Sequence, residues 1–181
     1  MGLTVSEVRK VFIYTPKGNI EKYLPFINLS LGKYQITEPL LVRYILCTVY
    51  AECQPFKPLI EKPHKFNTKV EPFDLYIGKG GNLNQKMAEA YLGRGFIQLT
   101  TFNNYRDYSK KLGIDLIADP DLAADPKIAA DILVLFIKER MGKILPALKA
   151  GEFIKARKQV NGGKMGIQHF MDAWQRSEFL S

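Results

Sequence analysis

The sequence has little of what metal or thiol chemistry requires. Its 181 residues include two cysteines and two histidines. Cys47 and Cys53 are six positions apart, on different faces of the helix expected there, so we expect no disulfide between them. His64 and His169 are isolated and do not make a zinc site with these cysteines. Zinc amidase chemistry and a Cys-His peptidase therefore lack a supporting motif. We expect no metal and no other cofactor.

Long apolar runs are also absent. No stretch approaches the length of a membrane span, and charges interrupt residues 1–23, which lack the apolar segment of a signal peptide. We expect either a mature secreted form or a protein made in the cytoplasm and released to the cell wall by phage-type or secretion-system delivery. The length and the 46% of apolar residues fit one globular domain over residues 1–181. We expect that domain to be a monomer.

Positively charged residues outnumber negatively charged ones. The net charge is +8, and residues 138–164 contain eight Lys or Arg against two Glu. An anionic polymer, such as bacterial wall or nucleic acid, suits this balance. Solvated helix faces are the alternative interpretation, and charge alone does not decide between them.

The apolar pattern is mainly helical. It predicts helices over residues 4–14, 18–31, 37–53, 101–112, 126–141, 152–160 and 164–177. The expected caps are Thr37 at the start of the third helix and, at helix ends, Gly32, Gly113, Gly142 and Gly162. Prolines and glycines make residues 54–83 a functional loop with a short hairpin. Alternation over 96–100 predicts a strand. The fold class is therefore mainly α (α+β), with a small irregular or β-containing lobe between helices.

Glu52 ends a largely apolar stripe on the helix expected over 37–53. The stripe consists of Leu41, Ile45 and Thr48 at helical spacing before it. Partial burial and the negative end of the helix dipole both disfavour the charged form of a carboxylate there, as a general acid requires. We expect Glu52→Gln to remove activity and to keep or raise stability. The alternative is a glutamate that reaches into solvent from a frayed helix end.

The loop that follows carries further carboxylates. Glu61 is nine residues after Glu52, and Glu71 and Asp74 come later. Glycoside hydrolysis requires a second carboxylate across the scissile bond from the acid, and such a loop can supply it. Each of these carboxylates could instead be a solvated surface charge.

Residues 93–105, GRGFIQLTTFNNY, combine a turn with polar groups. Two glycines around Arg94 predict a tight turn, after which Gln98 and Thr100 present an amide and a hydroxyl on one face. Asn104 and Tyr105 continue this polar and aromatic series. Neutral hydrogen-bonding groups with aromatic faces nearby are typical of sugar sites. A purely structural turn is the alternative.

The same segment resembles the signature of glycoside hydrolase family 19, which includes chitinases and phage endolysins. The resemblance continues over residues 112–130 and in Val160-Asn161-Gly162-Gly163. It implies a lysozyme-like, two-lobed helical fold with a substrate cleft. It also implies that Glu52 is the general acid and that the cleft is lined by Gln98, Thr100, Asn104 and Asn161.

Two positions depart from the family pattern. Ala51 stands where the family usually has His, and Ile77 stands where a second Glu is common. The spacing of Glu52, Glu61 and Thr68 instead resembles the catalytic triad of phage lysozymes. We therefore favour Glu61 as the second carboxylate, with Thr68 helping to hold the water. Glu71 and Asp74 remain the other candidates.

These features favour a muramidase that cleaves the β-1,4 bonds of peptidoglycan, because the positive charge and the triad-like spacing suit an anionic wall. A chitinase is the alternative. A catalytically inactive module that binds wall or nucleic acid is an alternative of another class. The expected partner is peptidoglycan or a chitin-like polysaccharide. We expect no nucleic acid, since no recognised nucleic-acid motif is present.

Overall fold

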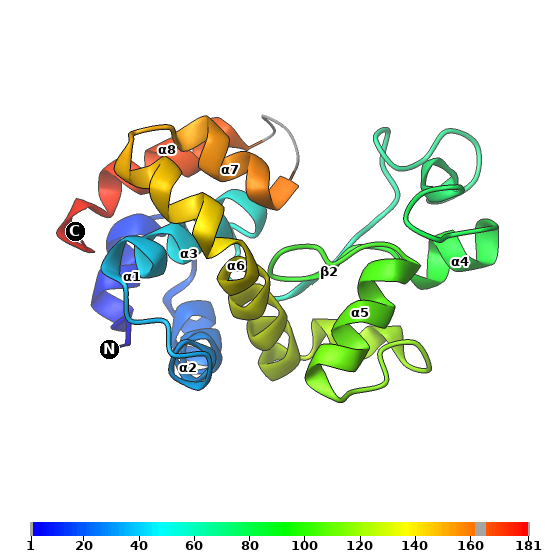
Figure 1. The fold of residues 1–181 in the computed structure, drawn as a ribbon, viewed down its shortest axis with the longest axis horizontal. Helices are drawn as coiled ribbons and strands as arrows, with labels where there is room; N and C mark the ends of the chain where they lie inside the picture. The colour runs from blue at the N-terminus through cyan, green and yellow to red at the C-terminus, as the bar shows by residue number, and fades with distance from the viewer. Residues whose placement is uncertain (1, 162–165, 181) are drawn as a thin grey trace. The chain divides into compact units, whose positions relative to one another are not determined.

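The computed structural model describes residues 2–161 and 166–180, and most of them are helical (Figure 1). The mainly α prediction with a small β element is confirmed. The chain forms two compact units, Met1–Lys57 with Leu133–Ser181, and Pro58–Ile132. The single domain over residues 1–181 stays a prediction. Within the described ranges, no helix is long and apolar enough to cross a bilayer.

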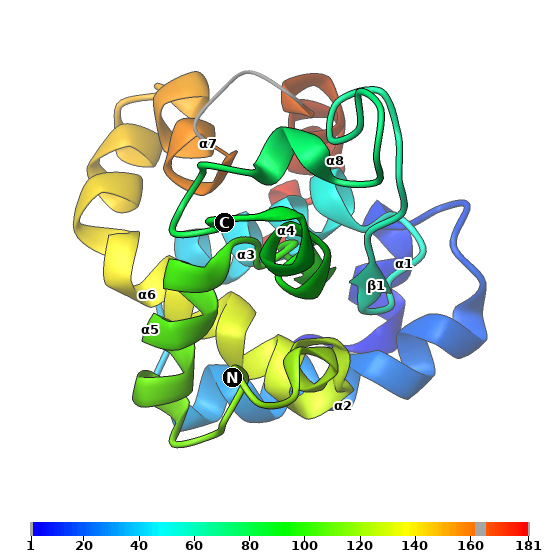
Figure 2. The ribbon, with the colours of Figure 1, turned by 90° about the vertical axis from the view of Figure 1, so that its right-hand side faces the viewer.

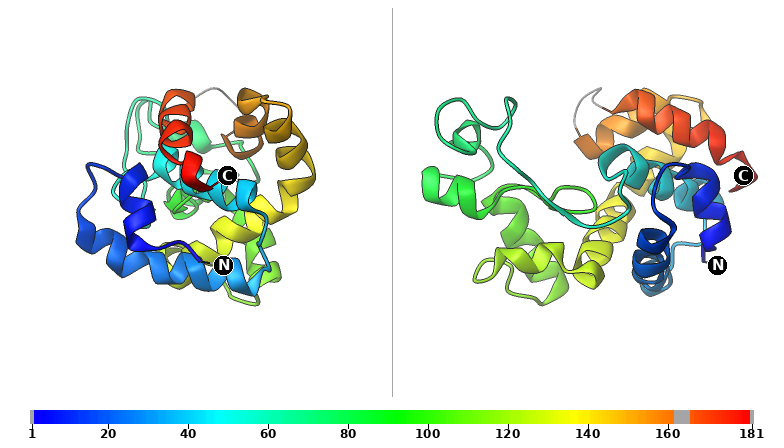
Figure 3. Two further views of the ribbon diagram at one scale, coloured as in Figure 1. Left: turned by 90° about the vertical axis from the view of Figure 1, so that its left-hand side faces the viewer. Right: turned by 180° about the vertical axis from the view of Figure 1, so that it is seen from behind.

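The first unit is helical. It contains α1 (Val5–Val11), α2 (Lys17–Lys33), α3 (Pro39–Glu52), the later part of α6 (Pro126–Lys149), α7 (Phe153–Asn161), α8 (Ile167–Arg176) and the short 3-10 helix η3 (Glu178–Leu180). Ten consecutive residues of α3, Leu41 to Tyr50, are buried. This helix packs against α8, and α8 also lies beside α1 (Figure 3). The residues around Glu52 are therefore fixed by the core of this unit.

Three predicted helix ends differ from the structure. Glu38, not Thr37, is the N-cap of α3, and it makes no side-chain capping bond. The N–H of Leu41, the third residue of the helix, instead bonds to the backbone carbonyl of Glu38 at 3.0 Å. Gly32 lies inside α2, and Gly142 lies inside α6, which continues to Lys149.

The helix end predicted at Gly113 is confirmed. It ends α5 (Phe102–Leu112) with a φ of 67°, the left-handed conformation that glycine adopts without strain. Gly162 lies outside the described residues.

The second unit is built around a two-stranded sheet. In it β1 (Leu59–Ile60) pairs antiparallel with β2 (Arg94–Gly95). The unit also holds η1 (Asp74–Tyr76), α4 (Gln85–Ala90), α5, η2 (Pro120–Ala124) and the start of α6. Figure 2 faces this unit and shows the long loop that follows β1. The predicted loop is confirmed, but the hairpin expected inside it is wrong, because β1 pairs with a segment beyond it.

The strand predicted over 96–100 is a tight turn. The backbone N–H of Arg94 donates to the Leu99 carbonyl at 3.1 Å, and the N–H of Leu99 donates to the Arg94 carbonyl at 2.8 Å. These two bonds close a hairpin over the residues between them. Gly95, with a φ of 88°, makes this reversal possible. The alternation nevertheless predicts burial correctly: Ile97 and Leu99 are buried, and residues 98 and 100 are half-buried.

Both cysteines are free and buried. Burial raises the pKa of Cys47 to about 12 and that of Cys53 to about 11. Each thiol therefore stays protonated at neutral pH and behaves as a small core side chain.

Candidate functional site

Glu52 is held inside the first unit. It is the last residue of α3, its side chain is 19% exposed, and its carboxylate forms an ion pair with the guanidinium of Arg157. The stripe before it is buried as predicted, since Leu41, Ile45 and Thr48 are each at most 1% exposed. The carboxylate is thus fixed by an ion pair rather than extended into solvent.

The sequence reasoning missed Arg157. Its side chain is 2% exposed, and it comes from α7, 105 residues after Glu52. A signal was present, because Phe153, Ala156 and Val160 make an apolar stripe on α7 and Arg157 falls within it. Chemically, a fixed guanidinium holds the carboxylate in one orientation. It also stabilises the negative charge that remains after the acid gives its proton away.

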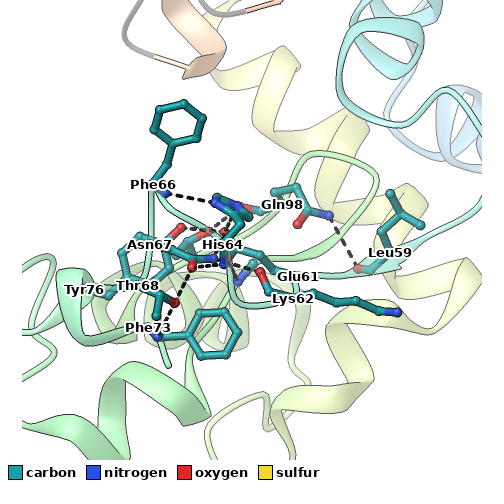
Figure 4. A network of polar contacts seen from close by, with 12 residues as sticks. Leu59, Glu61, Lys62, His64, Phe66, Asn67, Thr68, Phe73, Tyr76 and Gln98 are labelled. Atoms are coloured by element: carbon teal, nitrogen blue, oxygen red, sulfur yellow. Dashed lines mark hydrogen bonds and ion pairs between the residues drawn. The ribbon is translucent and has the colours of Figure 1, made fainter. Parts of the chain in front are cut away.

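Glu61 is the centre of a polar network in the second unit (Figure 4). Its side chain is 12% exposed. One carboxylate oxygen accepts hydrogen bonds from the Asn67 amide at 2.9 Å and the Tyr76 hydroxyl at 2.8 Å. The other accepts from the backbone N–H of Gly93 at 2.9 Å. The backbone N–H of Glu61 donates to the Gly93 carbonyl at 2.8 Å, which ties the loop to the segment before β2.

His64 adds a further donor to this carboxylate. Its Nε2 lies 3.5 Å from Glu61, and its Nδ1 accepts the backbone N–H of Phe66 at 3.2 Å. In the neutral ring the proton must therefore sit on Nε2, facing Glu61. Asn67, Tyr76 and His64 all face one carboxylate oxygen of Glu61, whereas the other oxygen accepts the Gly93 N–H. Since each carboxylate oxygen has about two acceptor sites, the oxygen bonded to Gly93 is the one that can take a proton from water in a base role.

Asn67 organises the loop that carries these groups. It is fully buried, and its amide also donates to the Lys62 carbonyl at 3.0 Å. Its oxygen accepts from the backbone N–H of His64 at 2.8 Å and from the Thr68 hydroxyl at 2.7 Å. A buried asparagine whose oxygen and amide are both used fixes the loop in one conformation.

Thr68 takes part in the same loop structure. Its hydroxyl donates to Asn67 and accepts the backbone N–H of Phe73 at 3.1 Å. These bonds show a structural role for the side chain. Its predicted role in holding the attacking water stays a prediction.

Tyr76 and Gly93 shape the position of the Glu61 carboxylate. Burial, and then the hydrogen bond to Glu61, raise the pKa of Tyr76 above its ordinary value, so its hydroxyl stays a neutral donor. A Cβ on Gly93 would lie 2.8 Å from a carboxylate oxygen of Glu61 and 2.8 Å from the side-chain oxygen of Gln98. Only glycine allows the backbone this close to both groups.

The other two loop carboxylates have different surroundings. Asp74 accepts the backbone N–H groups of Lys69, Val70 and Glu71 at 2.7, 2.8 and 3.2 Å. These bonds, with that of Val70 the largest contribution, lower the pKa of Asp74, and they close a turn. Glu71 is exposed. Among the loop carboxylates, Glu61 has the surroundings that fix a catalytic group.

The predicted sugar-binding side chains of the second unit are mostly accessible. Gln98 is half-buried, and its amide donates to the Gly95 carbonyl at 3.1 Å. The Thr100 hydroxyl donates to the Gln98 carbonyl at 2.6 Å, and the amide of Asn104, which is exposed, donates to the Thr100 carbonyl at 2.7 Å. Gln98 and Thr101 have φ values of 54° and 77°, a strained conformation that is concentrated at functional sites. Their contact with a sugar stays a prediction.

Tyr105 does not fit its predicted role. Its side chain is fully buried, and its hydroxyl donates to the Leu92 carbonyl at 2.7 Å and accepts from Arg94 at 2.9 Å. Burial raises the pKa of Tyr105 to about 12. A substrate cannot reach a ring enclosed in the core, so the aromatic position is structural. The side chain of Asn161 lies outside the described residues.

Comparisons with known proteins agree with the resemblance found in the sequence. Residues 63–145 match the family model of glycoside hydrolase family 19, described as class I chitinase. The match begins two residues after Glu61 and covers the signature at 93–105.

The fold is similar to that of chitinase C from Streptomyces griseus HUT6037, with a TM-score of 0.65 and 18% identity over 98% of this chain and 76% of that chain. A glutamate-to-glutamine mutant of chitinase C is similar at a TM-score of 0.62 and 18% identity, with coverages of 98% and 76%. No curated protein sequence matches the chain. The lysozyme-like fold prediction is confirmed.

Proposed function

We propose that this chain is a glycoside hydrolase that cleaves the β-1,4 bonds of chitin-type polymers of N-acetylglucosamine, because residues 63–145 match the family model of glycoside hydrolase family 19. The family match supports a hydrolase of β-1,4-linked glycans, and the fold is similar to that of chitinase C. The observation that supports the proposed chemistry best is the set of donors around Glu61. The reaction requires two fixed carboxyl groups, and the chain holds Glu61 in its second unit in this way and Glu52 in its first unit by Arg157.

In the proposed reaction the Glu52 carboxylate, which is paired with Arg157 in the resting protein, first takes a proton from solvent. It then gives that proton to the glycosidic oxygen as the bond to the anomeric carbon breaks. Glu61 takes a proton from a water molecule, whose oxygen forms the new bond to that carbon from the opposite face. The products are two shorter strands, and proton exchange with solvent returns both carboxyl groups to their starting states. The outcome is inversion, as the family resemblance implies. Thr68 helps to hold the water, while Gln98, Thr100 and Asn104 bind hydroxyl and acetamido groups of the sugars.

The order of the two candidate substrates is the reverse of the one that the sequence favoured. Net charge and triad-like spacing favoured peptidoglycan, whereas the matched family is described as chitinase. Peptidoglycan remains the second candidate because the chain carries a net charge of +8. An endolysin role, antimicrobial action and release to a cell wall belong to that second candidate. The match to a hydrolase family favours an enzyme over the inactive binding module, and the monomer stays an expectation.

One assay tests the proposal and separates the candidates. Release of reducing ends is followed on colloidal chitin and on purified peptidoglycan, with wild type beside Glu52→Gln. We expect faster release from chitin, and a loss of at least ~100-fold in the variant, the low end for one general acid. Release from peptidoglycan alone would move the assignment to muramidase. Near-normal release by the folded variant would exclude Glu52 as the proton donor.

A further inference from the structure

The turn between α1 and α2 exposes two adjacent apolar side chains. Ile13 is 52% exposed and Tyr14 is 88% exposed, whereas Phe12 before them is buried. Turns usually present polar residues and glycine to solvent. Core packing therefore does not explain why this turn carries a tyrosine.

The turn is nevertheless fixed. The Phe12 ring packs edge-on against Tyr50 at 5.0 Å and Phe56 at 4.8 Å between ring centroids. The Thr15 hydroxyl donates to the Gln54 carbonyl at 2.6 Å. Tyr14 is thus displayed on an anchored segment of the first unit, and holding it there costs little further conformational entropy when a ligand binds.

Two adjoining pockets lie beside Tyr14. They have volumes of about 550 and 270 Å³ and share the lining residues Tyr14, Tyr50 and Gln54. α8 contributes the rest of the larger pocket, including His169 and Gln175. A concave surface with aromatic walls and a few polar groups is typical of small-molecule sites.

The polar groups of the larger pocket nearly balance in charge. Gln54 and His169 share a hydrogen bond of 3.3 Å, and the guanidinium of Arg176 lies 4.6 Å from the Tyr50 ring centroid. Asp172 supplies the opposite charge. Amide, imidazole, carboxylate and guanidinium groups together suit an uncharged ligand rich in hydroxyl and amide groups.

The pocket is separate from the position of the proton donor. Successive residues of an α-helix are about 100° apart, so Tyr50 and Glu52 point to roughly opposite sides of α3. Glu52 pairs with Arg157 of α7, whereas Tyr50 faces α8, where the His169 ring lies 6.4 Å away. The two side chains therefore serve different surfaces of the same unit.

We propose that Tyr14, Gln54 and His169 form a second glycan-binding site, with the largely buried Tyr50 in its wall, and that this site holds a strand of β-1,4-linked N-acetylhexosamine. This inference rests on the proposed function for the identity of the strand. β-Linked pyranose rings carry an apolar C–H face, which stacks on an exposed aromatic ring, and an edge of hydroxyl and acetamido groups, which bonds to side chains such as Gln54. A site of this kind keeps the polymer attached while a distant bond is cleaved.

The test measures binding without cleavage. In the Glu52→Gln background, depletion from solution is measured on insoluble chitin and, separately, on purified peptidoglycan. Tyr14→Ala should weaken binding about 3- to 10-fold, the range of one aromatic contact, and His169→Ala should also weaken it. Tyr14→Trp should keep it. Leu29→Ala is the matched control, because Leu29 is 67% exposed on α2 of the same unit. Melting temperatures should be unchanged by Tyr14→Ala, since the side chain is in solvent.

Weaker binding of Tyr14→Ala to either polymer supports the site, and the polymer whose binding weakens identifies the bound strand. Weaker binding to both polymers points to the N-acetylhexosamine chain that they have in common. Equal binding by Tyr14→Ala and Leu29→Ala, or no binding of the parent to either polymer, would overturn the inference. The proposed function fails separately, if the unmodified chain releases no sugar from either polymer.

Discussion

Glu52 shares its environment with a charge that is more deeply buried than its own. The side chain of Arg157 is 2% exposed and that of Glu52 is 19% exposed. Removing the carboxylate charge therefore leaves a cation in a poorly solvated position, whereas removing the guanidinium leaves an anion that solvent partly reaches. Removing the charge of Glu52 and removing that of Arg157 should therefore lower the free energy of unfolding by different amounts.

This asymmetry reverses the stability expected for Glu52→Gln from the sequence. The amide still accepts a hydrogen bond but no longer faces Arg157 with a negative charge. We expect a melting temperature lower by about 3–8 °C, from the worth of a charge-assisted bond in a chain of this length. Calorimetry on the exposed control Glu71→Gln should show almost no change. The double variant Glu52→Gln/Arg157→Met should recover part of the loss, and a stable single variant would show that the pair contributes little.

The choice among the three loop carboxylates is also a question about single residues. Glu61 lies among fixed donors, Asp74 closes a turn, and Glu71 is exposed. We expect Glu61→Gln to lose at least ~10-fold more activity than Glu71→Gln or Asp74→Asn, from the magnitude of acid–base catalysis. Initial rates on a soluble chitin oligomer measure this. Equal losses at Glu61 and Glu71 would contradict the assignment.

Tyr76 acts as a positioning residue in this scheme. Tyr76→Phe removes the hydroxyl that donates to Glu61 at 2.8 Å and keeps the ring that stacks on Phe73. We expect kcat to fall about 10-fold, as for misplacement of an acid–base group, while KM changes little. A purely structural role would lower the melting temperature without this split. Phe73→Leu, which leaves the hydroxyl in place, serves as the matched control.

At the scale of elements, helices with a periodic apolar pattern could be predicted from the sequence. Contacts between segments far apart in the chain could not. The buried stripe of α3 follows from spacing within 14 residues. The pairing of β1 with β2 joins two-residue strands about 35 positions apart, too short to show any alternation. Asn67 lies in a proline-rich loop where composition suggests exposure, and its burial depends on contacts with Glu61 and Thr68 that only the folded loop provides.

The loop between β1 and α4 depends on Asp74 for one of its turns. Its pKa is lowered from the ordinary 3.8, first by the Val70 N–H. Because the folded value is depressed, the stabilisation is present above the unfolded value and is lost as pH falls through the folded one. The amide proton shifts of Lys69 and Val70 should therefore titrate with a midpoint below 3.8. Asp74→Ala should abolish that titration, and a midpoint above 3.8 would contradict the turn geometry.

At the scale of the whole molecule, the excess of positive charge bears on the choice of polymer. Exposed lysines such as Lys143, Lys149 and Lys158 carry part of it on the first unit. A field of one sign raises the local concentration of an anionic polymer. It gives no comparable advantage with chitin, which is uncharged, so the response to salt distinguishes the two candidate substrates.

We expect hydrolysis of neutral chitin oligomers to change less than about 2-fold between 0.01 and 0.1 M salt, a range over which the screening length falls from about 30 to 10 Å. If peptidoglycan is cleaved at all, its hydrolysis should weaken more steeply, because its anionic groups interact with the +8 charge through solvent. Replacing Lys143, Lys149 and Lys158 together by Gln should flatten the peptidoglycan response and leave the chitin response unchanged. An equal salt dependence on both polymers would mean that the basic residues only solvate helix faces. The charge would then no longer support peptidoglycan, and chitin would remain as the substrate that the family match favours.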